Sequence, residues 1–210
     1  MTPALRASLH AASEHFGAGL TDQALDRLEA YLEVLREWSR TTRLVADAEE
    51  ELVVHRHVID SLAVVPHLPP VGPVADIGSG AGFPGVVLGC LRPDLGLLLV
   101  ESRRKRASFL REVIRRVGLP SVTVAELRAE DLAGAMTHQC RATVSRGLRL
   151  GAFLTMSAPL LARGGYAIAM QAGRVFDVEH QVAGHGFRFG LQSVYHLPDG
   201  RPRRLVIARL

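Results

Sequence analysis

The strongest constraint on the fold of this chain is a glycine-rich turn that directly follows a short apolar run. The run Val74–Ile77 contains an acid, Asp76, and four glycines follow between residues 78 and 85. Glycine tolerates positive φ and has no Cβ, so the backbone here can turn tightly and approach a ligand closely. A helix opening near Pro84 would direct its free N–H groups into the same space. The turn therefore predicts a site for a nucleotide-like ligand.

Strands and helices alternate after this turn, and an acid, Glu101, ends the next apolar run. Such alternation predicts a parallel sheet covered on both faces, with the ligand beyond the carboxyl ends of the strands. The two apolar-alternating runs around Pro198-Asp199-Gly200 predict a terminal antiparallel hairpin. We expect strands over Val74–Ile77, Leu95–Val100, Val122–Ala125, Ala142–Val144, Tyr166–Met170, Leu191–Leu197 and Arg204–Ala208, and helices over Phe83–Leu91, Arg103–Val117 and Gly151–Leu161.

The first seventy residues read as helical. Thr21 can cap a helix whose apolar residues recur at spacings of three and four, and Asp47 with Glu50 resembles a capping box for another. Prolines at positions 66, 69, 70 and 73 then break the pattern. We therefore expect two parts, an N-terminal helical extension over residues 1–70 and a ligand-binding domain over residues 71–210.

Composition places the chain among cytoplasmic globular proteins. Its 210 residues suit one sizeable domain with a small appendage, and 48% of them are hydrophobic. No apolar run approaches the length of a bilayer-spanning helix, and no secretory signal is recognisable. Cys90 and Cys140 stand alone, which favours buried thiols in a reducing compartment over a disulfide or a metal site. We expect a monomer.

Charge is distributed unevenly along the chain. Residues 1–70 hold six Arg and eleven acids, whereas residues 141–210 hold ten Arg and three acids. A basic C-terminal part predicts contact with a polyanion. An arginine-rich proteome is the alternative, because only one of the 25 basic residues is Lys.

One expected helix concentrates basic residues. If the helix is functional, its basic side chains would contact an RNA backbone with salt-sensitive affinity. The alternative is a solvated helix face on which some arginines pair with acids. Few aromatic residues are available, so stacking of many single-stranded bases is not the expected mode. The basic side chains are Arg103, Arg104, Lys105, Arg106, Arg111, Arg115 and Arg116.

Two cofactor classes fit the turn. Gly80-x-Gly82-x-x-Gly85 matches a dinucleotide pattern, but residues 86–210 provide only enough strands to complete one sheet. The glycine turn, the later acid and the terminal hairpin together resemble the Rossmann-like fold of class I S-adenosylmethionine-dependent methyltransferases. That resemblance implies a mostly parallel seven-stranded sheet with a terminal antiparallel hairpin.

Further motifs occur in one order along the chain from about residue 20. With them the chain closely resembles the bacterial small-subunit ribosomal RNA methyltransferase G family, also called the glucose-inhibited division protein B family, which methylates N7 of a guanine. The resemblance implies S-adenosyl-L-methionine as cofactor and 16S rRNA or the small ribosomal subunit as partner. The motifs are Leu35-x-x-Trp38, Arg56-His57-Val58-Ile59-Asp60-Ser61-Leu62, Gly78-Ser79-Gly80-Ala81-Gly82-Phe83-Pro84-Gly85, Arg92-Pro93, Lys105-Arg106-x-x-Phe109-Leu110 and Ser145-Arg146.

The resemblance also implies site residues. Gly78, Gly80 and Phe83 would line the cofactor pocket, Glu101 would hold the ribose, and Ala129 with Glu130 would flank the adenine. Asp76 would orient the glycine turn or bind the cofactor's ammonium through water, unless it is a strand-end cap. His57 and Asp60 would line the pocket from the N-terminal helices, and Arg103, Arg104, Lys105 and Arg106 would face the substrate.

Arg146 is expected at the end of the fourth strand, where a family arginine stands at the junction of cofactor and substrate. An arginine there could bind a carboxylate or phosphate bidentately. The alternative is a structural ion pair, with Asp76 or Glu130. Guanine N7 has a lone pair and loses no proton on attack, so alignment is the main requirement. We therefore expect no general base, take Arg146 as the best candidate for alignment, and expect no metal, since His55 and His57 lack a third ligand.

Three departures from the family pattern concern the methyl acceptor. Arg43, Gly147 and Gln171 replace the usual Asn, Ala and Lys. They leave two alternatives open: a divergent paralogue that methylates another RNA or a small molecule, and a non-catalytic, cofactor-binding module associated with ribosomes.

Overall fold

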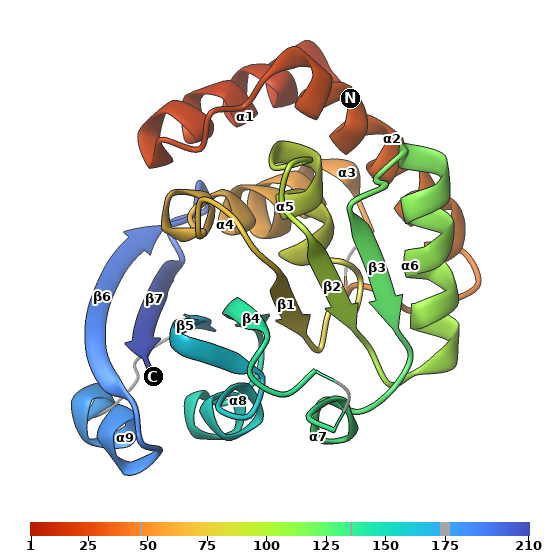
Figure 1. Cartoon of the computed structure of the whole chain (residues 1–210). Coiled ribbons are helices and arrows are strands. Elements are labelled where there is room, and N and C mark those ends of the chain that lie inside the picture. Colours follow the sequence, from red (N-terminus) through yellow and green to blue (C-terminus); the bar gives the residue numbers. More distant parts are fainter. Residues whose placement is uncertain (47, 135, 173–176) are drawn as a thin grey trace.

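The computed structural model describes residues 1–46, 48–134, 136–172 and 177–210, and these ranges contain one seven-stranded sheet in the order β3-β2-β1-β4-β5-β7-β6 (Figure 1). β1 to β5 run parallel, whereas β7 pairs antiparallel with both β5 and β6. The predicted parallel sheet with a terminal hairpin is confirmed. The strands are β1 (Val74–Ile77), β2 (Leu97–Val100), β3 (Val122–Ala125), β4 (Cys140–Arg146), β5 (Leu161–Ala172), β6 (Arg188–His196) and β7 (Pro202–Arg209).

Helices cover both faces of the sheet (Figure 1). Because successive side chains of a strand point to opposite faces, Val74 joins one hydrophobic cluster and Ala75 the other. The first cluster includes α1 (Pro3–Phe16), α2 (Asp22–Ser39), α3 (Glu50–Val53), the π-helical turn η1 (Val54–Val58), α4 (Ile59–Leu62), the 3-10 turn η2 (Val65–His67), α5 (Gly85–Leu91) and α6 (Arg104–Val117). The second includes α7 (Ala129–Leu132), α8 (Leu150–Ser157) and α9 (Val178–Gly184).

The N-terminal helices pack directly on the sheet domain. Trp38 of α2 meets Phe109 of α6 edge to face, with ring centroids 5.7 Å apart. The buried Tyr31, also on α2, donates its hydroxyl to the carbonyl of Ala81, 2.6 Å away in the glycine turn. The helices before residue 70 therefore help to shape that turn, and a division of the chain near residue 70 stays a prediction.

A local signal correctly predicted the start of one helix. Thr21 caps α2 by accepting the Ala24 N–H, as predicted. The predicted partner of Glu50, Asp47, lies outside the described residues, and α3 begins at Glu50. The helix expected over Gly151–Leu161 is wrong at its end: α8 stops at Ser157, where a turn brings the Leu160 N–H to the Ser157 carbonyl.

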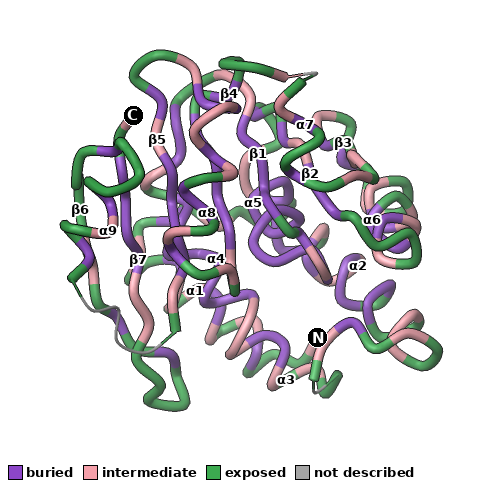
Figure 2. Tube along the Cα trace, turned by 90° about the horizontal axis from the view of Figure 1, so that it is seen from below, coloured by how far each residue is buried: buried purple, intermediate pink, exposed green. Residues whose placement is uncertain are grey.

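Burial follows the same plan. The central strands are buried, and β6, at the edge of the sheet, is largely exposed (Figure 2). Cys90 and Cys140 are buried and unbridged, as predicted. Over the described ranges, none of the helices combines the length and apolarity that a bilayer crossing requires.

Candidate functional site

The glycine turn after β1 uses its glycines for two different reasons. Gly78 and Gly80 have φ of 75° and 57°, which strains any other residue. Gly85 is needed for packing: a Cβ there would lie 2.3 Å from Leu99 Cδ2 and 2.5 Å from Asp76 Oδ2. The first glycines therefore shape the turn, and the last lets the following helix approach the sheet.

Glu101 holds the turn from β2. Its Oε2 accepts the Gly80 N–H at 3.0 Å, and its Oε1 accepts the Arg103 N–H at 2.8 Å. The residue is only 6% exposed. A carboxylate offers about four lone-pair positions, so two backbone donors leave room for further hydroxyl or N–H groups.

Asp76 is fully buried beneath the same turn. Its Oδ2 accepts the Gly85 N–H at 3.1 Å, and its backbone carbonyl accepts the Ser79 hydroxyl at 2.9 Å. Its Oδ1 has no hydrogen-bond partner among the described residues. Burial raises the pKa of Asp76 to about 7. These contacts are those of a residue that orients the turn.

Two hollows open at the carboxyl ends of the strands and meet at Gly78. The first, the Glu101 hollow, encloses about 190 Å³ and has largely apolar walls. It brings together four residues expected in the cofactor pocket, Gly78, Glu101, Ala129 and Glu130. Its lining is Ile77, Gly78, Val100, Glu101, Ser102, Leu127, Arg128, Ala129, Glu130, Leu148 and Met156.

The second hollow, the Arg146 hollow, encloses about 310 Å³ and is more polar. The expected residues His57, Gly80, Phe83, Arg106 and Arg146 gather here. The segment 44–46 also lines this hollow, next to the departure from the family pattern at Arg43. The lining is Leu44, Val45, Ala46, His57, Gly78, Ser79, Gly80, Ala81, Phe83, Arg106 and Arg146.

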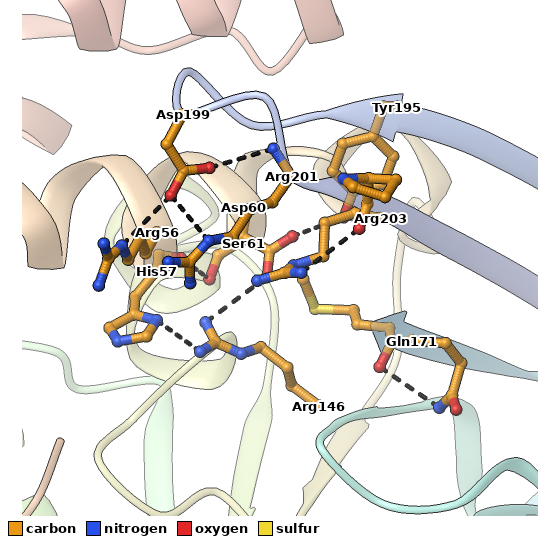
Figure 3. Close-up of polar contacts among 12 residues, drawn as sticks. Arg56, His57, Asp60, Ser61, Arg146, Gln171, Tyr195, Asp199, Arg201 and Arg203 are labelled. Atoms are coloured by element: carbon orange, nitrogen blue, oxygen red, sulfur yellow. Dashed lines mark hydrogen bonds and ion pairs between the residues drawn. The ribbon is translucent and has the colours of Figure 1, made fainter. Parts of the chain in front are cut away.

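Arg146 reaches this hollow from the end of β4. Its guanidinium lies over the Phe83 ring, 5.6 Å from the centroid, and Nη2 donates to His57 Nδ1 (Figure 3). Nη1 lies 3.6 Å from Asp60 Oδ2 and makes no hydrogen bond within the described chain. The ion pair considered for Arg146 therefore forms with Asp60, and the expected partners Asp76 and Glu130 were wrong.

Asp60 stands behind Arg146 and does not line either hollow, contrary to the prediction. It is buried, its Oδ1 accepts the Tyr195 hydroxyl at 2.7 Å, and its Oδ2 lies 3.5 Å from Arg203 Nε (Figure 3). Both partners come from the terminal hairpin. Sequence reasoning missed Tyr195 and Arg203, because no local pattern links them to a helix some 135 residues earlier.

His57 is held neutral next to Arg146. Burial and, after it, the Arg146 charge lower the pKa of His57 to about 4. The neutral ring can therefore accept the Arg146 N–H at Nδ1. His57 and Asp60 approach Arg146 from one side of the η1–α4 segment, so they form one support for the guanidinium.

The two ends of the basic helix α6 differ in whether their basic side chains pair with acids. Arg103, Arg104 and Lys105 are exposed at its start, next to the turn held by Glu101. The later arginines pair with acids, as the solvated-face interpretation predicts. These pairs are Arg111 with Glu126, Arg115 with Glu112, and Arg116 with Glu37 of α2.

The three departures lie in different settings. Arg43 is exposed just before the segment 44–46, Gly147 has a φ of 88°, and Gln171 donates to the Leu148 carbonyl at 2.9 Å. In the described part of the chain, no three His, Cys, Asp or Glu side chains gather closely enough to hold a metal ion.

Comparison with known proteins identifies a similar family. The model of a family described as rRNA small subunit methyltransferase G matches residues 24–189. Two proteins named Ribosomal RNA small subunit methyltransferase G are similar. The one from Polynucleobacter asymbioticus is 32% identical over 201 residues, covering 92% of this chain and 90% of the relative. The one from Xylella fastidiosa strain 9a5c is 42% identical over 159 residues, covering 73% and 74%.

Solved structures share the fold at low identity. A SAM-dependent methyltransferase from Aquifex aeolicus aligns with a TM-score of 0.59 and 16% identity, covering 75% of this chain and 92% of that one. The 1,6-didemethyltoxoflavin-N1-methyltransferase from Burkholderia thailandensis aligns with a TM-score of 0.60 and 15% identity, covering 90% and 91%. The resemblance to a methyltransferase fold is confirmed.

Replacing His57 with Gln should change how stability depends on pH. The unfolded imidazole takes up its proton near pH 6.5, but the folded one only near pH 4, so acidification through this window favours the unfolded chain. Between pH 7 and pH 5, the free energy of unfolding of wild type, measured with urea, should fall by about 1 to 2 kcal/mol more than that of His57→Gln. The exposed His196→Gln is the control. An equal loss in wild type and His57→Gln would contradict the neutral, buried state of His57.

Proposed function

Because this chain belongs to the rRNA small subunit methyltransferase G family, we propose that it transfers the methyl group of S-adenosyl-L-methionine to N7 of a guanine in 16S ribosomal RNA. The observation that carries this proposal is the pair of hollows meeting at Gly78. One is built around a buried carboxylate, Glu101, and the other is bordered by the guanidinium of Arg146, which Phe83 and His57 support.

The Glu101 hollow fits the nucleoside part of the cofactor. The lone pairs that Glu101 does not use on backbone N–H groups suit the two adjacent hydroxyls of a ribose. Ile77, Leu127 and Met156 supply apolar surface for an adenine, between Ala129 and Glu130. Gly78 brings no Cβ between the two hollows, so a ligand can pass from one into the other.

The Arg146 hollow fits the reacting end. The Arg146 guanidinium lines this hollow and suits a carboxylate or a phosphate oxygen, and Gly80 leaves its side of the hollow open. Asp76 would hold the turn from beneath. When bound, S-adenosyl-L-methionine supplies a methyl group already activated by its sulfonium. Arg146, supported on Phe83 and His57, would align the acceptor with that group, and a guanine N7 needs no base.

The start of α6 is the proposed RNA contact. Arg103, Arg104 and Lys105 are exposed beside the turn, and Arg106 lines the Arg146 hollow. Phosphate contacts of this kind position an RNA without reading its sequence. We further propose that the protein acts in the cytoplasm as a monomer, on ribosomal RNA or on the assembled small subunit.

Methyl transfer to small ribosomal subunits tests the function directly. Purified protein should move labelled methyl from S-adenosylmethionine onto subunits that lack the modification, and nuclease digestion should yield labelled N7-methylguanosine. Label in tRNA or in a small molecule alone would select the divergent-paralogue alternative. Cofactor binding without transfer to any cell extract would select the non-catalytic alternative.

Replacing Glu101 with Gln should weaken cofactor binding. The amide NH₂ would face one of the two backbone N–H groups from which the carboxylate now accepts hydrogen bonds, so two donors would meet. A ribose hydroxyl would also lose a charged acceptor. We expect S-adenosylhomocysteine to bind about 10- to 100-fold more weakly by calorimetry. The control Glu126→Gln removes an exposed carboxylate paired with Arg111 and should bind within about twofold of wild type. Equal affinity for both variants would remove Glu101 from the cofactor site.

Two arginines of one helix should differ in RNA binding. Arg104→Gln removes an exposed cation beside the turn, whereas Arg115→Gln removes one that pairs with Glu112 at the far end of α6. In binding to ribosomal RNA, Arg104→Gln should lower the slope of log affinity against log salt by about 1, and Arg115→Gln should leave it unchanged. The reverse order would place the RNA elsewhere on the surface.

A further inference from the structure

A buried polar cluster links the terminal hairpin to the Arg146 hollow. Tyr195 of β6 and Arg203 of β7 face each other in the hairpin register, and both contact Asp60 of α4. Asp60 in turn lies against Arg146. Through Asp60 the hairpin is linked to Arg146 at the hollow (Figure 3).

The two oxygens of Asp60 have separate partners. Oδ1 accepts the Tyr195 hydroxyl, whereas Oδ2 lies between the two guanidinium groups, 3.6 Å from Arg146 Nη1 and 3.5 Å from Arg203 Nε. Ion-pair distances of this length leave the carboxylate plane loosely fixed by the arginines. The short hydrogen bond from Tyr195 is the contact that sets its rotation.

The same cluster carries one more cation than anion. Arg146 and Arg203 share one carboxylate, and the neighbouring His57 is neutral, so a small turn of Asp60 would favour one arginine over the other. Buried charges without water respond strongly to such changes in distance. The position of the Arg146 guanidinium at the hollow therefore depends on where Asp60 Oδ2 stands.

We propose that Tyr195 is a positioning residue for methyl transfer: its hydroxyl fixes the Asp60 carboxylate, and Asp60 fixes Arg146 in the hollow. Tyr195 lines neither hollow and acts on the reaction only through these two residues. This inference rests on the proposed function, because Arg146 is the residue that aligns the acceptor.

Tyr195→Phe isolates the hydroxyl. The ring also packs edge to face on Phe16, with centroids 5.3 Å apart, and Phe keeps that contact. Tyr166→Phe is a matched control, because Tyr166 also donates one hydroxyl hydrogen bond, to the His67 carbonyl at 2.8 Å, without contacting Asp60 or Arg146. Both variants lose one hydroxyl and one hydrogen bond.

The experiment compares steady-state methyl transfer to unmodified small subunits. Tyr195→Phe should lower kcat about tenfold through misplacement of Arg146, while the KM for the subunit and the affinity for S-adenosylhomocysteine stay within about twofold. Tyr166→Phe should keep wild-type kcat. In an Arg146→Lys background, adding Tyr195→Phe should change kcat less than about twofold, because the group through which Tyr195 acts is already gone.

Each outcome decides between the two proposals. If wild type is active and Tyr195→Phe retains the kcat of Tyr166→Phe, the positioning role is overturned and the proposed function stands. If Tyr195→Phe loses tenfold in both the wild-type and the Arg146→Lys backgrounds, its effect does not pass through Arg146, and the inference again fails. If wild type modifies no subunit, the proposed function fails and this inference with it.

Discussion

The arrangement of the Arg146 hollow depends on one guanidinium, that of Arg146, which must stay charged and fixed although it is mostly shielded from water. Removing a charge from water costs several kcal/mol unless a partner compensates it, and Arg146 receives that compensation from Asp60. Asp60 comes from the N-terminal helices, and its other partners come from the terminal hairpin. The N-terminal helices and the terminal hairpin therefore meet behind Arg146.

The glycine turn and Glu101 could be predicted from the sequence, because their signals are local. Glycines at fixed spacing, an acid at each of two strand ends, and alternating apolar runs determined the turn, Glu101 and the hairpin within a few residues. The Arg146 hollow is formed by contacts between distant segments. No spacing rule joins Asp60 to Tyr195, and the resemblance supplied residues such as His57, Asp60 and Arg146 one by one, without their contacts.

A count of basic residues in the sequence likewise does not predict which of them stay unpaired and exposed. The sequence places seven basic residues between positions 103 and 116, and their number alone predicts a continuous basic surface. Three of these arginines pair with acids from α2, from α6 itself and from the loop after β3. Of these seven basic residues, those at the start of α6 stay exposed beside the glycine turn, so the positions of the acids, and not composition, decide where unpaired positive charge remains.

Asp76 and Glu101 show how differences in burial and hydrogen bonding give two carboxylates different roles. Asp76 is sealed beneath the turn with one backbone donor, and its pKa rises to about 7. Glu101 receives two backbone donors and borders a hollow, so its remaining lone pairs can meet a ligand. A strand-end acid followed by glycine thus identifies the turn, and the next strand's acid identifies the carboxylate that borders the hollow. The support of Arg146 lies outside both signals, in the η1–α4 segment and the terminal hairpin, which contacts between distant residues bring together.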